Sequence, residues 1–129
     1  MSKALDVVKT FYHAALKGNI EEMTRLLAPD VRWTEMAGSP YGGTYVGCDA
    51  VVLKVFKPRG AEWLNFVFTP ERFHDTRKSV AVSGWYTAIS VKTRRRLHCR
   101  SLHVWDVRED KVIAFEQFCD SLLMHRSMT

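Results

Sequence analysis

A carboxylate at the end of an apolar strand face is the first residue in this sequence that could do chemistry. Residues 31–36 alternate in type, and Val31, Trp33 and Glu35 share one side because successive strand side chains point to opposite faces. Burying an unpaired carboxylate costs several kcal/mol unless a partner or a raised pKa neutralises it. The pattern therefore predicts either a functional pocket at Glu35 or a structural ion pair, and we favour the pocket.

An imidazole falls on a second inward face. In the segment 97–108, alternation places His103 with Leu97, Cys99 and Trp105, which form the more apolar set. A lone histidine on an apolar face is commonly a satisfied core residue, so His103 alone does not indicate catalysis. Together with Glu35 it does, because a carboxyl group and an imidazole in one cavity can set each other's protonation state.

Two further polar residues are candidates for the same cavity. Tyr12 lies on the apolar stripe of a predicted N-terminal helix, where core packing with the hydroxyl reaching water is the alternative. On the last predicted strand, alternation offers Gln117 as the inward polar group. Glu116 takes that place if the preceding turn is tighter.

The position of Tyr86 depends on strand register. Pairing Lys92 with Leu97 across an arginine-rich turn would put Tyr86 opposite His103 on the same face. A slip of one residue would bring a neighbour of Tyr86 there instead, because it would turn every side chain to the other face.

Three helices are predicted in the first half of the chain. The first runs from a Ser2 cap to about Lys17, the second begins at Asn19, and the third covers about 49–57 before Pro58. A loop rich in glycine follows the Glu35 strand. The second half consists of strands separated by short polar turns, over about 63–74, 79–91, 97–108 and 111–119, with a short helix after Ser121.

These elements predict the fold class. Helices followed by consecutive hairpins indicate an α+β domain, with a curved antiparallel sheet of about five strands, counting the short first one, and the three helices on one face. The 129 residues make one domain, 1–129. No apolar run approaches the roughly 20 residues of a membrane span, and the N-terminus lacks the apolar core of a secretory signal.

Cysteine, histidine and charge patterns argue against several further classes of protein. Three distant cysteines without a Cys-x-x-Cys pair predict a reducing cytoplasm and no disulfide framework. The five histidines show no metal-ligand spacing, and no glycine-rich phosphate loop is present, so neither metal nor cofactor is expected. The net charge of the chain is +5, and a cluster of basic residues lies at Lys92, Arg94, Arg95, Arg96 and Arg100. We interpret this cluster as a solvated hairpin rather than a phosphate-binding patch, because no nucleic-acid motif accompanies it.

The chain resembles the nuclear transport factor 2-like superfamily, in particular its SnoaL-like and ketosteroid-isomerase-like branch. The residues that carry the likeness are Phe11–Asn19, Leu27–Glu35, Gly38–Gly47, and His103–Arg108 continuing through Lys111–Ile113 to Asp120. The resemblance implies a cone-shaped fold in which the sheet wraps around helices to enclose an apolar cavity. It also implies a homodimer through the outer sheet face.

The resemblance assigns roles to some of the residues found above. Tyr12 matches the oxyanion-hole tyrosine of ketosteroid isomerases, and Glu35 falls where their proton-moving carboxylate stands. His103 occupies the position of their oxyanion-hole acid, which is a departure. In polyketide cyclases a histidine matching His103 pairs with an aspartate on the last strand, where this chain has Gln117.

The leading hypothesis is a cofactor-independent isomerase or cyclase/hydrolase. Glu35 would abstract a proton next to a carbonyl while Tyr12 and His103 bind the developing enolate oxygen. An apolar, cyclic carbonyl substrate would be walled by aromatic side chains, namely Trp33, Tyr41, Trp63 and Tyr86. The alternatives are a non-catalytic domain that binds an apolar ligand, or a dimerisation module that uses outer-face residues such as Leu102.

Overall fold

The structure, a computed structural model, describes residues 2–129. Capping side chains begin its first two helices, as predicted. The Ser2 side chain accepts a hydrogen bond from the Leu5 N–H (3.1 Å) at the start of α1 (Lys3–Leu16). The Asn19 side chain accepts one from the Glu22 N–H (3.1 Å) at the start of α2 (Ile20–Arg25). Gly18 lies between them with φ +65°, a conformation that glycine adopts without strain.

The third helical segment is longer than predicted. It comprises α3 (Cys48–Val51), a π-helical turn η1 (Val52–Phe56) and α4 (Lys57–Glu62), which follow one another without a break. The expectation that Pro58 would end the helix was wrong. Pro58 follows directly on the π-helical turn, where the Lys57 N–H bonds to the Val52 carbonyl five residues back and the regular α-helical hydrogen bonding is interrupted.

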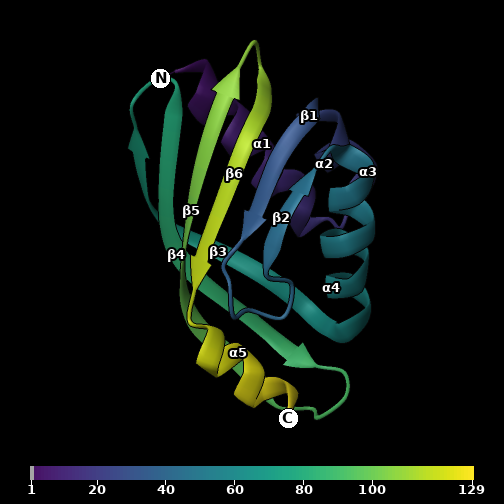
Figure 1. The fold of residues 1–129 in the computed structure, drawn as a ribbon. Helices are drawn as coiled ribbons and strands as arrows, with labels where there is room; N and C mark the ends of the chain where they lie inside the picture. Colours follow the sequence, from purple (N-terminus) through teal and green to yellow (C-terminus); the bar gives the residue numbers. More distant parts are fainter. Residues whose placement is uncertain (1) are drawn as a thin grey trace.

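The sheet has six strands in the order β2-β1-β6-β5-β4-β3. The strands are β1 (Leu27–Glu35), β2 (Gly43–Val46), β3 (Trp63–Asp75), β4 (Ser79–Ser90), β5 (Arg96–Arg108) and β6 (Lys111–Cys119). A last helix, α5 (Ser121–Met128), follows β6. Figure 1 shows the long strands β3 to β6 curving together, with α1 behind them and the α3–α4 column beside β1 and β2.

The α+β class and the curved, open sheet are confirmed, with two differences from the predicted antiparallel sheet of about five strands. Part of the glycine-rich loop forms β2, which pairs with β1 so that Tyr45 lies opposite Trp33. The pairing of β1 with β6 is parallel, so the sheet is mixed. Local pattern cannot reveal either feature, because each depends on a partner strand.

The predicted register between β4 and β5 was also wrong, by four residues. His103 lies opposite Val82, and Tyr86 lies opposite Cys99. The connecting loop is wider than a simple turn because Arg94 has φ +62° and its N–H bonds to the Ser90 carbonyl (2.9 Å). A shift of four residues is an even number, so Tyr86 stays on the same face of the sheet as His103.

Helices and sheet enclose an aromatic core. Phe11 of α1 packs against Trp33 of β1 and Trp105 of β5, with ring centroids 5.9 and 4.8 Å apart. The Trp33 ring stacks on Phe115 of β6 at 3.8 Å. These contacts hold α1 to the concave face of the sheet and build one wall of a cavity. Within residues 2–129, no helix is long and apolar enough to cross a membrane.

Candidate functional site

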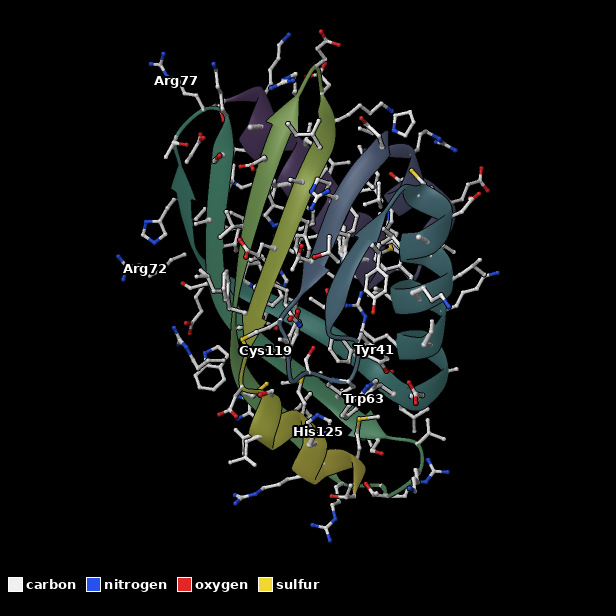
Figure 2. The ribbon with its side chains drawn as sticks, viewed as in Figure 1. Tyr41, Trp63, Arg72, Arg77, Cys119 and His125 are labelled. Carbon is white, nitrogen blue, oxygen red and sulfur yellow. The ribbon has the colours of Figure 1, made fainter. Side chains whose placement is uncertain are left out.

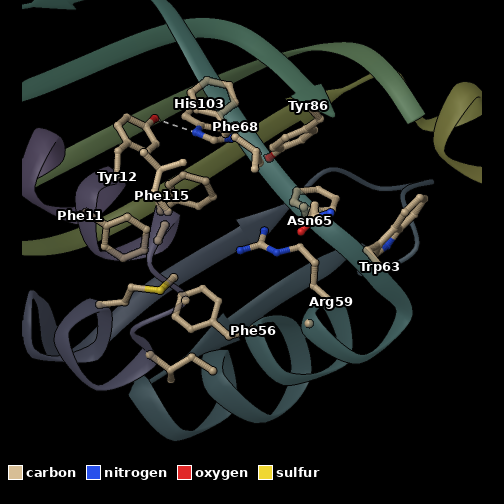
Figure 3. Close-up of a pocket in the computed structure, with 18 of the residues that line it drawn as sticks. Phe11, Tyr12, Phe56, Arg59, Trp63, Asn65, Phe68, Tyr86, His103 and Phe115 are labelled. Atoms are coloured by element: carbon tan, nitrogen blue, oxygen red, sulfur yellow. Dashed lines mark hydrogen bonds between the residues drawn. The ribbon is translucent and has the colours of Figure 1, made fainter. Parts of the chain in front are cut away.

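A cavity of about 370 Å³ opens between the helices and the concave face of the sheet. Pockets that bind small molecules span roughly 300–1,000 Å³ and are mostly apolar. Aromatic side chains make up most of this wall, including Trp33, Phe66 and Trp105. Figure 3 labels others of this set, namely Phe11, Phe56, Trp63, Phe68 and Phe115. The polar groups on the wall are few, and they converge from different elements.

A tyrosine–histidine–tyrosine chain forms the polar part of the wall. The Tyr12 hydroxyl lies 2.7 Å from Nδ1 of His103, and the Tyr86 hydroxyl lies 2.7 Å from Nε2 of the same ring. The bond between Tyr12 and His103 is visible in Figure 3. Tyr12 comes from α1, Tyr86 from β4 and His103 from β5. All three line the cavity and are nearly fully buried.

Two further side chains donate hydrogen bonds to the two tyrosine hydroxyls. Nε1 of Trp105 donates to the Tyr12 hydroxyl (2.9 Å), and Nε2 of Gln117 donates to the Tyr86 hydroxyl (3.2 Å). The Gln117 amide oxygen accepts from the Met36 N–H (3.1 Å), which fixes the amide's orientation. Gln117 is 1% exposed and Glu116 is exposed, so glutamine is the inward group on β6.

The hydrogen bonds between Tyr12, His103 and Tyr86 leave one tyrosine O–H that the imidazole does not use. A neutral imidazole has one N–H and one acceptor nitrogen, so His103 donates to one tyrosine and accepts from the other. The tyrosine that receives the imidazole N–H already accepts from Trp105 or Gln117, so its own O–H needs another acceptor. With the proton on Nε2, the Tyr86 O–H can turn to the neighbouring Ser101 hydroxyl. With the proton on Nδ1, the Tyr12 O–H at the cavity wall is available to a bound molecule.

Burial holds these groups in their neutral forms. Desolvation lowers the pKa of His103 well below 6.5, and the positive charge of Arg59 lowers it further. Desolvation also raises the pKa of Tyr12 well above 10.0, and the pKa of Tyr86 is raised mainly for the same reason. The imidazole is therefore uncharged and both phenols keep their protons at neutral pH.

Glu35 lies behind this wall and is 2% exposed. Its Oε2 atom accepts a hydrogen bond from Nε1 of Trp33 (2.9 Å), a cavity-lining residue. Desolvation raises the pKa of Glu35, while the charge of Arg59 and the Trp33 hydrogen bond act in the opposite direction. Trp33 and Glu35 sit two residues apart on β1, so the strand's alternation brings both inward.

The cavity wall includes five of the predicted site residues and leaves three behind it. Tyr12, Trp33, Trp63, Tyr86 and His103 line the cavity. Glu35, Gln117 and Tyr41 lie outside this lining. The Tyr41 hydroxyl accepts from Nε1 of Trp63 (3.2 Å) and donates to Glu62 (2.7 Å), so Tyr41 positions Trp63.

Sequence reasoning missed Arg59, which lines the cavity from α4. Figure 3 shows its guanidinium reaching into the hollow between the aromatic rings. The signal was present in the spacing, because a helix that continues past Pro58 places Arg59 on the face of Val55 and Phe56, four and three residues earlier. Ending the helix near residue 57 hid this relation.

Metal-ligating groups are scattered in the part of the chain that the structure describes. No three histidine, cysteine, aspartate or glutamate side chains gather there in a way that could hold a metal ion. The cysteines Cys48, Cys99 and Cys119 are free thiols. Burial and the neighbouring Cys99 raise the pKa of Cys119 to about 12.

The buried Glu35 carboxyl and the buried His103 imidazole make the free energy of unfolding depend on pH in opposite directions. Glu35 has a folded-state pKa above its ordinary 4.5, so its contribution to stability falls as the pH rises from 4.5 through that raised value. His103 has a folded-state pKa below 6.5, so its contribution is lost as the pH falls below 6.5.

We expect Glu35→Gln to remove the pH dependence of stability that is due to Glu35 and to keep the one that is due to His103. The unfolding free energy of the variant minus that of the wild type should increase with pH above 4.5, by at most about 1.4 kcal/mol per pH unit, and then level off. Urea titrations between pH 4.5 and 8 measure this difference. A difference that stays constant with pH would mean that the Glu35 pKa is not raised.

Comparisons with known proteins agree with this architecture. The family model described as the SnoaL-like domain matches residues 8–115. No match was found among curated protein sequences. An NTF2-like protein from Burkholderia thailandensis is 36% identical, with a TM-score of 0.94 and coverage of 100% of this chain and 99% of that one.

Two other solved structures extend the comparison. An NTF2-like protein from Burkholderia pseudomallei is 29% identical, with a TM-score of 0.92 and coverage of 100% and 99% of the two chains. A protein with a ketosteroid-isomerase-like fold from Catenulispora acidiphila is 15% identical, with a TM-score of 0.81 and coverage of 94% and 91%. At that identity the likeness shows the fold alone.

Proposed function

This chain belongs to the SnoaL-like domain family of the NTF2-like superfamily, and we propose that it is an isomerase or cyclase/hydrolase. It would act by general acid–base chemistry on an apolar cyclic carbonyl compound, without a cofactor. The observation that carries the proposal is the Tyr12 O–H on the wall of an aromatic cavity, which is unused when Nδ1 of His103 carries the imidazole proton. Such a donor is suited to an oxygen on which negative charge develops.

The unused O–H would bind the substrate carbonyl. As a proton leaves the neighbouring carbon, charge moves onto that oxygen, and a preorganised donor of this kind stabilises the transition state by roughly 3 kcal/mol. Tyr12 and Tyr86 both have raised pKa values, so the donor keeps its proton before the reaction. His103 would be a positioning residue, because the two tyrosines occupy both of its nitrogens.

Glu35 would move the proton. Its raised pKa lies closer to neutral pH, where a group can both accept and return a proton. Of its two oxygens, Oε2 receives the Trp33 bond, and within residues 2–129 Oε1 has no hydrogen-bond partner. Because Glu35 lies just behind the cavity wall, the transfer would pass through one water molecule or a small rotation of the side chain.

A second candidate function is non-catalytic binding of an apolar ligand. It is favoured by the closed hydrogen-bond network of His103 and by the position of Glu35 outside the cavity lining. A dimerisation role through the outer sheet face would use Leu102 (36% exposed) and Phe118 (39% exposed). A homodimer through this face and a cytoplasmic location remain predictions.

Deuterium exchange tests the proposed reaction class. A panel of one- to three-ring cyclic ketones is incubated with the protein in D₂O, and incorporation at the carbon next to the carbonyl is followed by mass spectrometry. We expect at least one ketone to exchange faster than in buffer, with saturation in ketone concentration. Ketones that bind, as seen by quenching of tryptophan fluorescence, but exchange only at the buffer rate would favour the binding domain instead.

A further inference from the structure

Among residues 2–129, Arg59 is the only charged side chain in the lining of the cavity. The other lining residues are apolar, aromatic or neutral, and His103 is uncharged because burial lowers its pKa. The wall therefore carries a net charge of about +1 at neutral pH. Asn65 is a further polar side chain in the same lining.

The Arg59 guanidinium lacks a protein anion in direct contact. The ion pairs in the described chain are Arg25–Glu21 and Arg100–Glu71, both on the surface. The charge of Arg59 lowers the pKa of Glu35, but the two side chains form no ion pair within 4.0 Å. The guanidinium instead lies over aromatic rings, 4.9 Å from the centroid of Phe66 and 5.8 Å from that of Phe56.

This arrangement favours an anionic ligand, because Arg59 is only partly exposed and a molecule that fills the cavity displaces water from around it. A cation among aromatic rings loses hydration and regains only part of it from the ring faces. A guanidinium presents a planar set of N–H donors that matches a carboxylate in two parallel hydrogen bonds. Its aromatic surroundings at the same time favour an apolar ring.

We propose that the cavity binds a ring compound that bears a carboxylate, with the carboxylate on Arg59 and the ring among Phe11, Phe68 and Phe115. This inference deepens the proposed function, because it rests on the same small-molecule cavity and names the charge of the ligand. The ring then lies between Arg59 and the Tyr12–His103–Tyr86 chain. A carbonyl on the far side of the ring would meet the unused tyrosine O–H.

Charge inside the cavity supports the same assignment. Glu35 already has a raised pKa through desolvation. A carboxylate bound to Arg59 partly cancels the positive charge that lowers this pKa, so the bound ligand would raise the pKa of Glu35 further. This shift moves the pKa of the proposed base toward neutral pH.

A matched pair of probes tests the proposal. The probes are 2-naphthoate and its neutral counterpart 2-naphthamide, titrated at pH 7.5 and low salt, with binding followed by calorimetry and by tryptophan fluorescence. In the wild type we expect naphthoate to bind about 10- to 100-fold tighter than naphthamide, as a charge-assisted bidentate contact implies. Equal affinities would overturn the proposal, and so would a failure of both probes to bind.

Variants assign the effect to one side chain. Arg59→Met should abolish the preference for naphthoate while naphthamide still binds, and Arg59→Lys should retain part of it, because lysine keeps the charge without the planar fork. The control is Lys57→Met, which removes an exposed cation from the same helix and should leave the preference unchanged. A preference that survives Arg59→Met, or disappears in Lys57→Met, would contradict the assignment.

The outcome is separable from that of the ketone exchange experiment. Naphthoate preference without ketone exchange would support the anion site and remove the proposed catalysis. Ketone exchange without naphthoate preference would support the catalysis and remove the anion site.

Discussion

Replacing Glu35 by glutamine should slow the exchange of a ketone substrate's proton by about 10²- to 10⁴-fold, the usual contribution of a general base. Glutamine keeps the size of the side chain and an oxygen that can accept the Trp33 N–H, but it cannot take up a proton. Affinity for the ketone should change little, because Glu35 lies outside the cavity lining. The measurement is saturation kinetics of deuterium incorporation, so that kcat and KM are obtained separately.

Glu116→Gln provides the matched control for this variant. It makes the same chemical change on β6, where Glu116 is exposed and lies opposite Thr34, the residue before Glu35. Its exchange rate should equal that of the wild type. An unchanged kcat in Glu35→Gln would remove Glu35 from the mechanism, whereas equal losses in both variants would indicate a nonspecific effect of charge.

Replacing Gly84 by alanine should destabilise the protein by about 3 kcal/mol, at the upper end of the usual cost of overpacking. A Cβ at Gly84 would lie 2.2 Å from the Thr69 carbonyl oxygen and 2.8 Å from Cζ of Phe68. The carbonyl belongs to the backbone of β3, so the clash is relieved only by moving one strand away from the other. Urea unfolding at neutral pH measures the loss.

The same displacement should disturb the cavity. The Phe68 ring packs 4.0 Å from the His103 ring, centroid to centroid, and both residues line the cavity. For the stability measurement Gly60→Ala is the control, because a Cβ at Gly60 meets nothing within 4 Å and the residue lies in a helix. We expect it to stabilise the protein by about 0.5 kcal/mol through helix propensity. A loss below about 1 kcal/mol in Gly84→Ala would show that β3 accommodates the methyl group.

The sequence predicted the inward faces of the strands more reliably than their pairing. Tyr86 lies on the face of His103 even though the predicted register was wrong by four residues. Alternation is a local property with a period of two, so an even shift leaves every face unchanged. The same rule favoured Gln117 while leaving Glu116 as an alternative, and the structure shows that Gln117 is the buried group on the last strand.

Elements that depend on distant partners were not predictable in this way. The strand β2 is formed by residues that look like a loop, and it exists because β1 offers its edge. Short polar turns, by contrast, were predictable without a partner. Figure 2 shows Arg72 extending from the edge strand β3 and Arg77 from the predicted turn between β3 and β4.

The sequence by itself determined which side chains face inward and where most helices and strands begin and end. Alternation, capping residues and turn residues act over a few neighbours, so they can be interpreted without a partner. The tertiary structure alone decided that two tyrosines share one imidazole, that Glu35 lies behind Trp33, and that Arg59 is the charged group in the cavity. Those relations join α1, α4, β1, β4 and β5, and they arise only when the curved sheet packs against the helices and brings residues that are distant in sequence together.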